Sequence, residues 1–180
     1  MSPLGLLVVG APQQASAEVE ALLATLSPRF AVPVILVLHR GPEDVSVGPL
    51  GRRCPLAVFE PDDKDELAAG RVYLAPSGYH LLVDRGSVCL SREPFEHGQR
   101  PAVDPLFESA ADAYGPATAA LLFGGHEDGW TGLSTVQARG GHVAVVGEGE
   151  PVQGVERVPL SQVKAWLERL SYAPRMKVQP

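Results

Sequence analysis

The chain has 180 residues and a mass of 19.1 kDa, which is enough for one domain with a substantial hydrophobic core. Its net charge of −6 and isoelectric point near 5.3 argue against a surface that attracts nucleic acid, so we expect no nucleic-acid partner. Because no apolar run approaches the length of a membrane span, we also expect no membrane insertion.

The cysteines and the first residues bear on the cellular compartment. Cys54 and Cys89 form neither a metal-binding spacing nor a disulfide framework. The apolar run at residues 4–9 lacks the basic leader of a secretion signal, because the first basic residue is Arg29. We therefore expect a cytoplasmic protein.

The first part of the chain alternates apolar runs with a helical pattern. Residues 6–10 predict a buried strand that ends at Gly10, where a glycine-bearing turn begins. A helix that closes at Ser27-Pro28 is predicted by the helical spacing of Val19, Leu22, Leu23 and Leu26. Residues 32–38 predict a second buried strand, and residues 41–51, rich in Gly and Pro, predict a loop rather than a helix.

Short β-rich runs occupy the middle of the chain. Residues 56–59 predict a strand, and the acidic residues 60–66 predict a solvated loop. Three further runs are separated by turn sequences and predict a hairpin-like excursion; they lie at 71–75, 79–83 and 87–91.

Helices and strands alternate again in the second half. The clearest helix is 102–114, whose apolar residues form one continuous face and which Gly115 stops. The remaining predicted elements are a strand at 117–123, a helix at 128–139, a strand at 142–146 and a helix at 161–170.

This order of elements predicts an α/β protein. We expect a three-layer α/β/α domain with a mainly parallel, doubly wound sheet of about seven strands and a β-hairpin excursion in the middle. The domain is expected to span residues 1–172, followed by a C-terminal tail at 173–180.

Two chemistry-bearing side chains follow predicted strands. His39 ends the second strand and Asp128 follows the strand at 117–123, and ligands of open parallel sheets collect at this carboxyl edge. A nucleophilic triad needs a hydroxyl or thiol on a tight turn, an imidazole and a carboxylate. His39 and Asp128 suit the last two roles, whereas the turn after the first strand offers Pro12.

Plainer interpretations of these residues stay open. His39 can be an ordinary satisfied histidine, and Asp128 can be a helix N-cap. A zinc site made by His39, His126, Glu127 and Asp128 is a further possibility, but we favour two histidines meeting in a degenerate cleft and predict no metal. Backbone N–H groups of the glycine turns at Gly10-Ala11 and Gly124-Gly125 are candidates for oxyanion stabilisation.

Several segments resemble the catalytic domain of the CheB-type chemotaxis receptor methylesterases. The family's first strand is followed by Gly-Ala-Ser-x-Gly-Gly, which becomes Gly10-Ala11-Pro12-Gln13-Gln14-Ala15, and its second strand ends in Gln-His, here Leu38-His39. Residues 72–80 resemble its Val-Tyr-(Val/Leu)-Ala-Pro-Gly-Gly-x-His. Residues 100–111 resemble Arg-Pro-(Ser/Ala)-Val-Asp-x-Leu-Phe-x-Ser-Ala-Ala, and residues 123–133 resemble Thr-Gly-Met-Gly-x-Asp-Gly-x-x-Gly-Leu.

The resemblance implies that His39 is the triad histidine, that Asp128 is the triad aspartate and that Pro12 stands in place of the serine nucleophile. Proline has no hydroxyl and no backbone N–H, although it is tolerated where a helix begins.

Other departures from the family lie beside these positions. Gln14 and Ala15 replace two glycines, and Gly125 and His126 replace a methionine and a glycine at the pocket rim. The expected substrate and oxyanion region comprises Gly10, Ala11, Gln13, Gly124, Gly125 and His126.

The resemblance therefore implies a CheB-like protein-glutamate methylesterase domain of a bacterial chemosensory pathway. Because Pro12 cannot act as the nucleophile, we expect lost or impaired hydrolysis and a binding or regulatory role. The implied partners are chemoreceptor cytoplasmic helices or other chemosensory proteins, and no cofactor is expected.

Two alternatives remain. One is an active methylesterase or glutamine deamidase with a displaced nucleophile, for which the candidates are Ser16, Thr131, Cys54 and Cys89. The other is a scaffold that uses only the fold.

Overall fold

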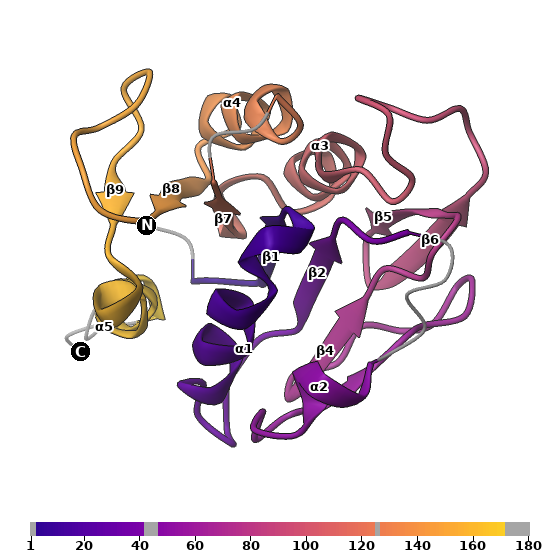
Figure 1. Ribbon diagram of the computed structural model, residues 1–180, viewed down its shortest axis with the longest axis horizontal. Coiled ribbons are helices and arrows are strands. Elements are labelled where there is room, and N and C mark those ends of the chain that lie inside the picture. The colour runs from indigo at the N-terminus through magenta and orange to yellow at the C-terminus, as the bar shows by residue number, and fades with distance from the viewer. Residues whose placement is uncertain (1–2, 42–46, 125–126, 172–180) are drawn as a thin grey trace, which may run out of the picture.

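In the computed structural model, which describes residues 3–41, 47–124 and 127–171, seven parallel strands form one sheet. They are β1 (Leu6–Ala11), β2 (Val34–Leu38), β3 (Ala57–Phe59), β4 (Arg71–Leu74), β7 (Thr118–Phe123), β8 (His142–Val146) and β9 (Arg157–Val158). Their order across the sheet is β3-β4-β2-β1-β7-β8-β9, so the chain begins at the centre and winds outward to both edges (Figure 1).

Helices cover both faces of this sheet. One face carries α1 (Ser16–Ala24), α2 (Gly48–Gly51) and α5 (Leu160–Ser171). The other face carries α3 (Val103–Tyr114), α4 (Trp130–Ala138) and the antiparallel hairpin of β5 (His80–Asp84) and β6 (Ser87–Ser91) (Figure 1). Two short 3₁₀ turns are η1 (Gln13–Ala15) and η2 (Gly115–Ala117). The predicted three-layer α/β/α fold with its hairpin excursion is confirmed.

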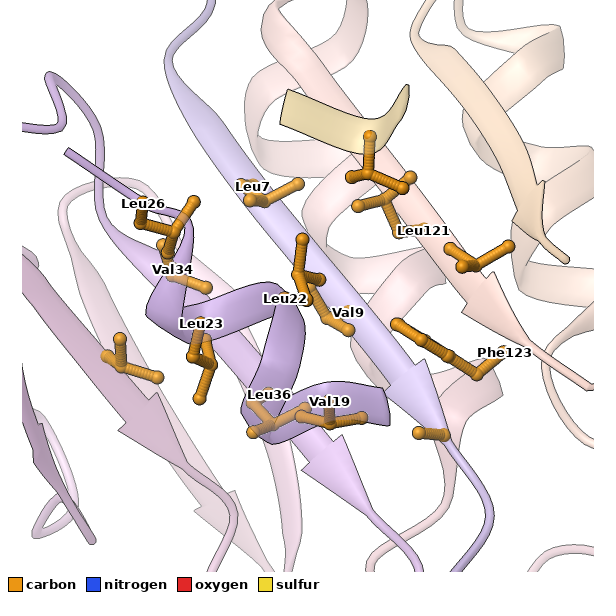
Figure 2. Close-up of a cluster of buried hydrophobic side chains, with 14 of the residues drawn as sticks. Leu7, Val9, Val19, Leu22, Leu23, Leu26, Val34, Leu36, Leu121 and Phe123 are labelled. Carbon is orange, nitrogen blue, oxygen red and sulfur yellow. The ribbon is translucent and has the colours of Figure 1, made fainter. Parts of the chain in front are cut away.

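The packing of α1 explains why the central strands are apolar throughout. Val19, Leu22 and Leu23 of α1 are each at most 1% exposed and join one buried cluster with side chains of β1, β2 and β7 (Figure 2). Burying one such side chain stabilises the fold by roughly 1.5–3 kcal/mol. The turn that leads from β1 into α1 is therefore held firmly over the carboxyl edge of the sheet.

The structure differs from the sequence-based expectations at α2, α4 and β9. Part of the predicted loop at 41–51 forms the single-turn helix α2, because Leu50 is buried and Pro49 is compatible with a first helical turn. The helix α4 begins two residues later than predicted, because Gly129 has a φ of +108°. The two-residue strand β9 is too short to leave a sequence pattern. The predicted tail at 173–180 lies outside the described residues.

No helix in the part of the chain that the structure describes is both long enough and apolar enough to cross a membrane.

Gly10 belongs to the first strand, as predicted, but the prediction of a turn at Gly10-Ala11 is wrong. β1 continues to Ala11, and Gly10 pairs with Val37 on one side and Leu122 on the other. A Cβ atom at position 10 would lie 2.3 Å from Cγ1 of Val103, the first residue of α3. The glycine therefore allows the start of α3 to pack directly against the central strand.

Gly10→Ala should destabilise the protein by about 1–3 kcal/mol, because the added methyl group overlaps Val103. Urea unfolding of Gly10→Ala, Val103→Ala and the double variant measures the coupling. The double variant should lose less stability than the sum of the single variants, since the smaller residue at 103 makes room for the methyl group. Additive losses would contradict this account of Gly10.

Candidate active site

His39 and Asp128 meet at the carboxyl edge of the sheet. His39 directly follows β2, and its backbone N–H donates to the carbonyl of Ala11 at 2.9 Å. Its ring Nε2 lies 2.6 Å from Oδ2 of Asp128, which follows β7 and is 3% exposed. Two residues that are 89 positions apart in the chain thus form one buried pair, with the imidazole held by a carboxylate.

Asp128 also caps a helix, although not the one that it precedes. Its Oδ2 accepts the backbone N–H of Val103 at 2.7 Å, and its Oδ1 accepts that of Asp104 at 2.9 Å. These are the first N–H groups of α3, which have no acceptor inside the helix. Asp128 is therefore not the N-cap of α4, whose N-cap residue is Gly129; its carboxylate joins His39 to the start of α3 instead.

Asp104 makes the reciprocal contact, which no sequence pattern indicated. Its Oδ1 accepts the backbone N–H groups of Gly129 at 3.0 Å and Gly132 at 2.7 Å, at the start of α4. Its Oδ2 lies 2.9 Å from Nε2 of His97. Each aspartate thus caps the helix that begins beside the other aspartate, and each carries one histidine.

Glycine allows α3 and α4 to approach closely enough for this arrangement. A Cβ atom on Gly132 would lie 2.5 Å from Cβ of Phe107 and 3.0 Å from the carbonyl oxygen of Asp104. Any side chain at position 132 would push the two helices apart.

The hydrogen bonds shift two pKa values. Burial alone raises the pKa of the Asp128 carboxyl, but the hydrogen bonds from His39, Val103 and Asp104 outweigh burial and hold it below its ordinary value. The pKa of His97 is raised, chiefly by its hydrogen bond to Asp104 and further by the charges of Asp128 and Glu127. Asp128 is therefore an anion at neutral pH.

The two carboxylates are already used as hydrogen-bond acceptors. Ligand atoms of His97, Asp104 and Asp128 lie within 4.8 Å of one another, close enough to suggest a cation site. Backbone or imidazole nitrogens contact all four carboxylate oxygens, so these contacts satisfy the negative charge without a metal ion. The zinc ligand set considered from the sequence includes His126, which lies outside the described residues.

Pro12 stands between β1 and η1, beside a cleft of 570 Å³. Its φ of −73° and ψ of 161° are ordinary for proline, and its carbonyl accepts the N–H of Ala15 at 3.0 Å. The cleft is also lined by His39, Gln13 and Gln14. The structure therefore brings a His–Asp pair to a cleft that Pro12 also borders.

The predicted oxyanion residues are only partly placed. Gly10 and Ala11 lie within β1 rather than in a turn. Gly124 directly follows β7 with a φ of +80°, a conformation that favours glycine. Gly125 and His126 lie outside the described residues. An oxyanion role for these groups stays a prediction.

The cleft is lined by five side chains that sequence reasoning missed: Arg40, Ser77, Phe95, Gln99 and Arg100. Arg40 follows His39 directly, and Ser77 and Arg100 lie in segments that resemble the CheB family, so position could have suggested all three. Phe95 lies in a polar loop and carries no such signal.

A parallel α/β sheet with a His–Asp pair beside a cleft at its carboxyl edge is typical of serine-type hydrolase folds. The family model described as CheB methylesterase matches residues 7–169, so the chain belongs to the CheB methylesterase family.

Relatives agree with this membership. The chain is 37% identical over 150 residues to protein-glutamate methylesterase/protein-glutamine glutaminase 5 of Myxococcus xanthus, covering 79% of this chain and 43% of that protein. A protein-glutamate methylesterase/protein-glutamine glutaminase of Nocardioides sp. is 40% identical over 151 residues, covering 78% and 41% respectively. The chain thus spans less than half the length of these two curated relatives.

A solved structure agrees as well. The crystal structure of the Thermotoga maritima CheB methylesterase catalytic domain superposes with a TM-score of 0.83 at 25% sequence identity. The superposition covers 94% of this chain and 100% of that domain.

His97→Gln should lower the free energy of unfolding by about 0.5–1 kcal/mol at acidic pH, because it removes a partly exposed ion pair with Asp104. The folded-state pKa of His97 is raised, so its contribution is fully present below the ordinary value of 6.5 and disappears as pH rises through the raised pKa. Thermal or urea unfolding across this pH range measures the difference from wild type.

His142→Gln is the matched control, because His142 forms no ion pair with any described residue. If the difference in free energy of unfolding between His97→Gln and wild type stays constant or grows as pH rises, the assigned His97–Asp104 ion pair is contradicted.

Proposed function

We propose that this chain is a CheB-like module of a bacterial chemosensory pathway that no longer hydrolyses its target and acts by binding. The observation that carries the proposal is Pro12, which borders the cleft beside a His39–Asp128 pair that is still assembled at 2.6 Å. The position that the family resemblance implies for the nucleophile has no nucleophilic atom.

The triad mechanism explains why the residue at position 12 matters more for activity than the other matches to the family. In a triad mechanism, a serine oxygen attacks the ester carbonyl while the histidine accepts its proton and the aspartate stabilises the resulting imidazolium. Pro12 has no hydroxyl to attack with, so no acyl-enzyme can form at this residue. Removing the nucleophile of a serine hydrolase costs on the order of a millionfold in turnover.

Displaced nucleophiles receive little support from the geometry. Ser77 lines the same cleft, but its Oγ donates to the carbonyl of Gly41 at 3.3 Å and is not hydrogen-bonded to His39. Ser16 begins α1 and lines a neighbouring cleft of 270 Å³ that His39 also borders, but the hydroxyl of Ser16 is not hydrogen-bonded to His39. Burial raises the pKa of the Cys54 thiol, which makes it a weaker nucleophile.

The relatives supply the proposed partner. Proteins of this family that are named protein-glutamate methylesterase/protein-glutamine glutaminase act, by that name, on glutamate and glutamine side chains of proteins. We propose that the cleft binds glutamate-bearing cytoplasmic helices of chemoreceptors, or of another chemosensory protein, in the cytoplasm.

Methanol release from a carboxyl-methylated receptor cytoplasmic fragment tests the loss of activity. Wild type should release methanol at the background rate. Pro12→Ser should raise the rate at least about a hundredfold over wild type, because it restores a nucleophile beside an assembled His–Asp pair. Adding His39→Ala to Pro12→Ser should return the rate to background.

Circular dichroism and thermal melting establish that each variant is folded. Release by wild type that disappears in His39→Ala would contradict the proposal and identify an active esterase; Ser77→Ala would then be the next variant to assay.

A further inference from the structure

We propose that Arg100, stacked on Phe95 at the cleft, binds a carboxylate side chain of the partner, so that the cleft retains free glutamate in preference to glutamine or glutamate methyl ester. This inference rests on the proposed binding function. It adds the chemical state of the side chain that the cleft recognises.

Arg100 has hydrogen-bonding capacity that the protein leaves unused. Its Nη1 donates to the backbone carbonyls of Arg92 and Glu93, both at 3.3 Å. Its Nε is buried and has no hydrogen-bond partner among the residues that the structure describes, and Nη2 makes no hydrogen bond within the same residues. A buried N–H without an acceptor is costly, and Nε and Nη2 together form the planar edge that matches the two oxygens of a carboxylate.

The charge of Arg100 is also not paired, in contrast to that of its neighbour in the cleft. Arg40 forms an ion pair with Glu60 and donates to the carbonyl of Ala75 at 2.8 Å, so its charge is already balanced. Arg100 forms no ion pair with any carboxylate in the described ranges. A cation that lines the cleft is therefore available for an anion from outside.

Phe95 provides the contact surface around this cation. Its side chain is 60% exposed, and the guanidinium carbon of Arg100 lies 4.4 Å from its ring centroid. A second stack lies next to it, because Arg92 lies 4.8 Å from the ring of Tyr79 and accepts, through its carbonyl, the hydrogen bond from Arg100. Aromatic and arginine side chains dominate the binding energy of protein interfaces.

This arrangement distinguishes three forms of one side chain. A glutamate carboxylate offers two charged acceptors to two donors, whereas a methyl ester offers only neutral acceptors. A glutamine amide offers one neutral acceptor and presents an N–H₂ group to a site made of donors. The guanidinium thus favours the demethylated, unamidated state.

Fluorescence anisotropy with three synthetic receptor-helix peptides tests the inference. The peptides are identical except for one position, which is glutamate, glutamine or glutamate methyl ester. Wild type should bind the glutamate peptide about tenfold more tightly than either neutral peptide, as expected for a charge-assisted pair.

Variants separate the role of Arg100 from a general effect of positive charge. Arg100→Gln should remove the preference and leave weak binding of all three peptides. Arg100→Lys should keep part of the preference, because it keeps the charge and loses the planar edge. Arg139→Gln is the matched control, since Arg139 is exposed on α4's C-terminal side and pairs with Asp112. Phe95→Ala removes the ring on which Arg100 stacks and keeps the hydrogen bonds of Arg100 to the carbonyls of Arg92 and Glu93, so it should weaken binding of the glutamate peptide.

Two outcomes overturn the inference in different ways. Equal affinity of wild type for the three peptides would overturn carboxylate selection and leave the proposed binding function standing. Failure of the folded wild type to bind any of them would overturn the proposed binding function, and this inference with it.

Discussion

Two buried aspartates, each capping the helix that starts beside the other, organise the centre of this protein. Burying a carboxylate is costly, and four backbone N–H groups and two imidazoles offset the cost for Asp104 and Asp128. These reciprocal capping hydrogen bonds fix the starts of α3 and α4 relative to each other and to β7. It requires Gly10 and Gly132, because a side chain at either position would separate the elements that the aspartates join.

Because of this arrangement, Asp128 has a structural role that does not depend on catalysis. Its carboxylate holds the first turn of α3 through Val103 and Asp104 whether or not His39 ever accepts a proton. Pro12 likewise fits its place, since its backbone angles are ordinary for proline and a helical turn follows it. The fold therefore tolerates a proline at position 12, and an intact His–Asp pair is not by itself a sign of activity.

The cleft has features that suit the proposed binding role. Its wall includes an arginine with unused donors and an exposed aromatic ring, on a chain whose net charge is −6. A local cation on an acidic protein directs an acidic partner to one place, because the rest of the surface disfavours it. The proposed binding through the cleft and the proposed loss of hydrolysis are thus compatible with each other.

The sequence by itself determined the alternation of strands and helices, the parallel sheet, the hairpin, and the placement of His39, Asp128 and Pro12 at strand ends. These follow from local hydrophobic periodicity and from the geometry of parallel sheets. Tertiary structure alone decided that β1 continues to Ala11, that Asp104 caps α4 while Asp128 caps α3, and that Arg100 and Phe95 line a cleft beside His39. Contacts between residues 25 or 89 positions apart depend on how whole helices and strands pack. Local sequence patterns do not predict that packing.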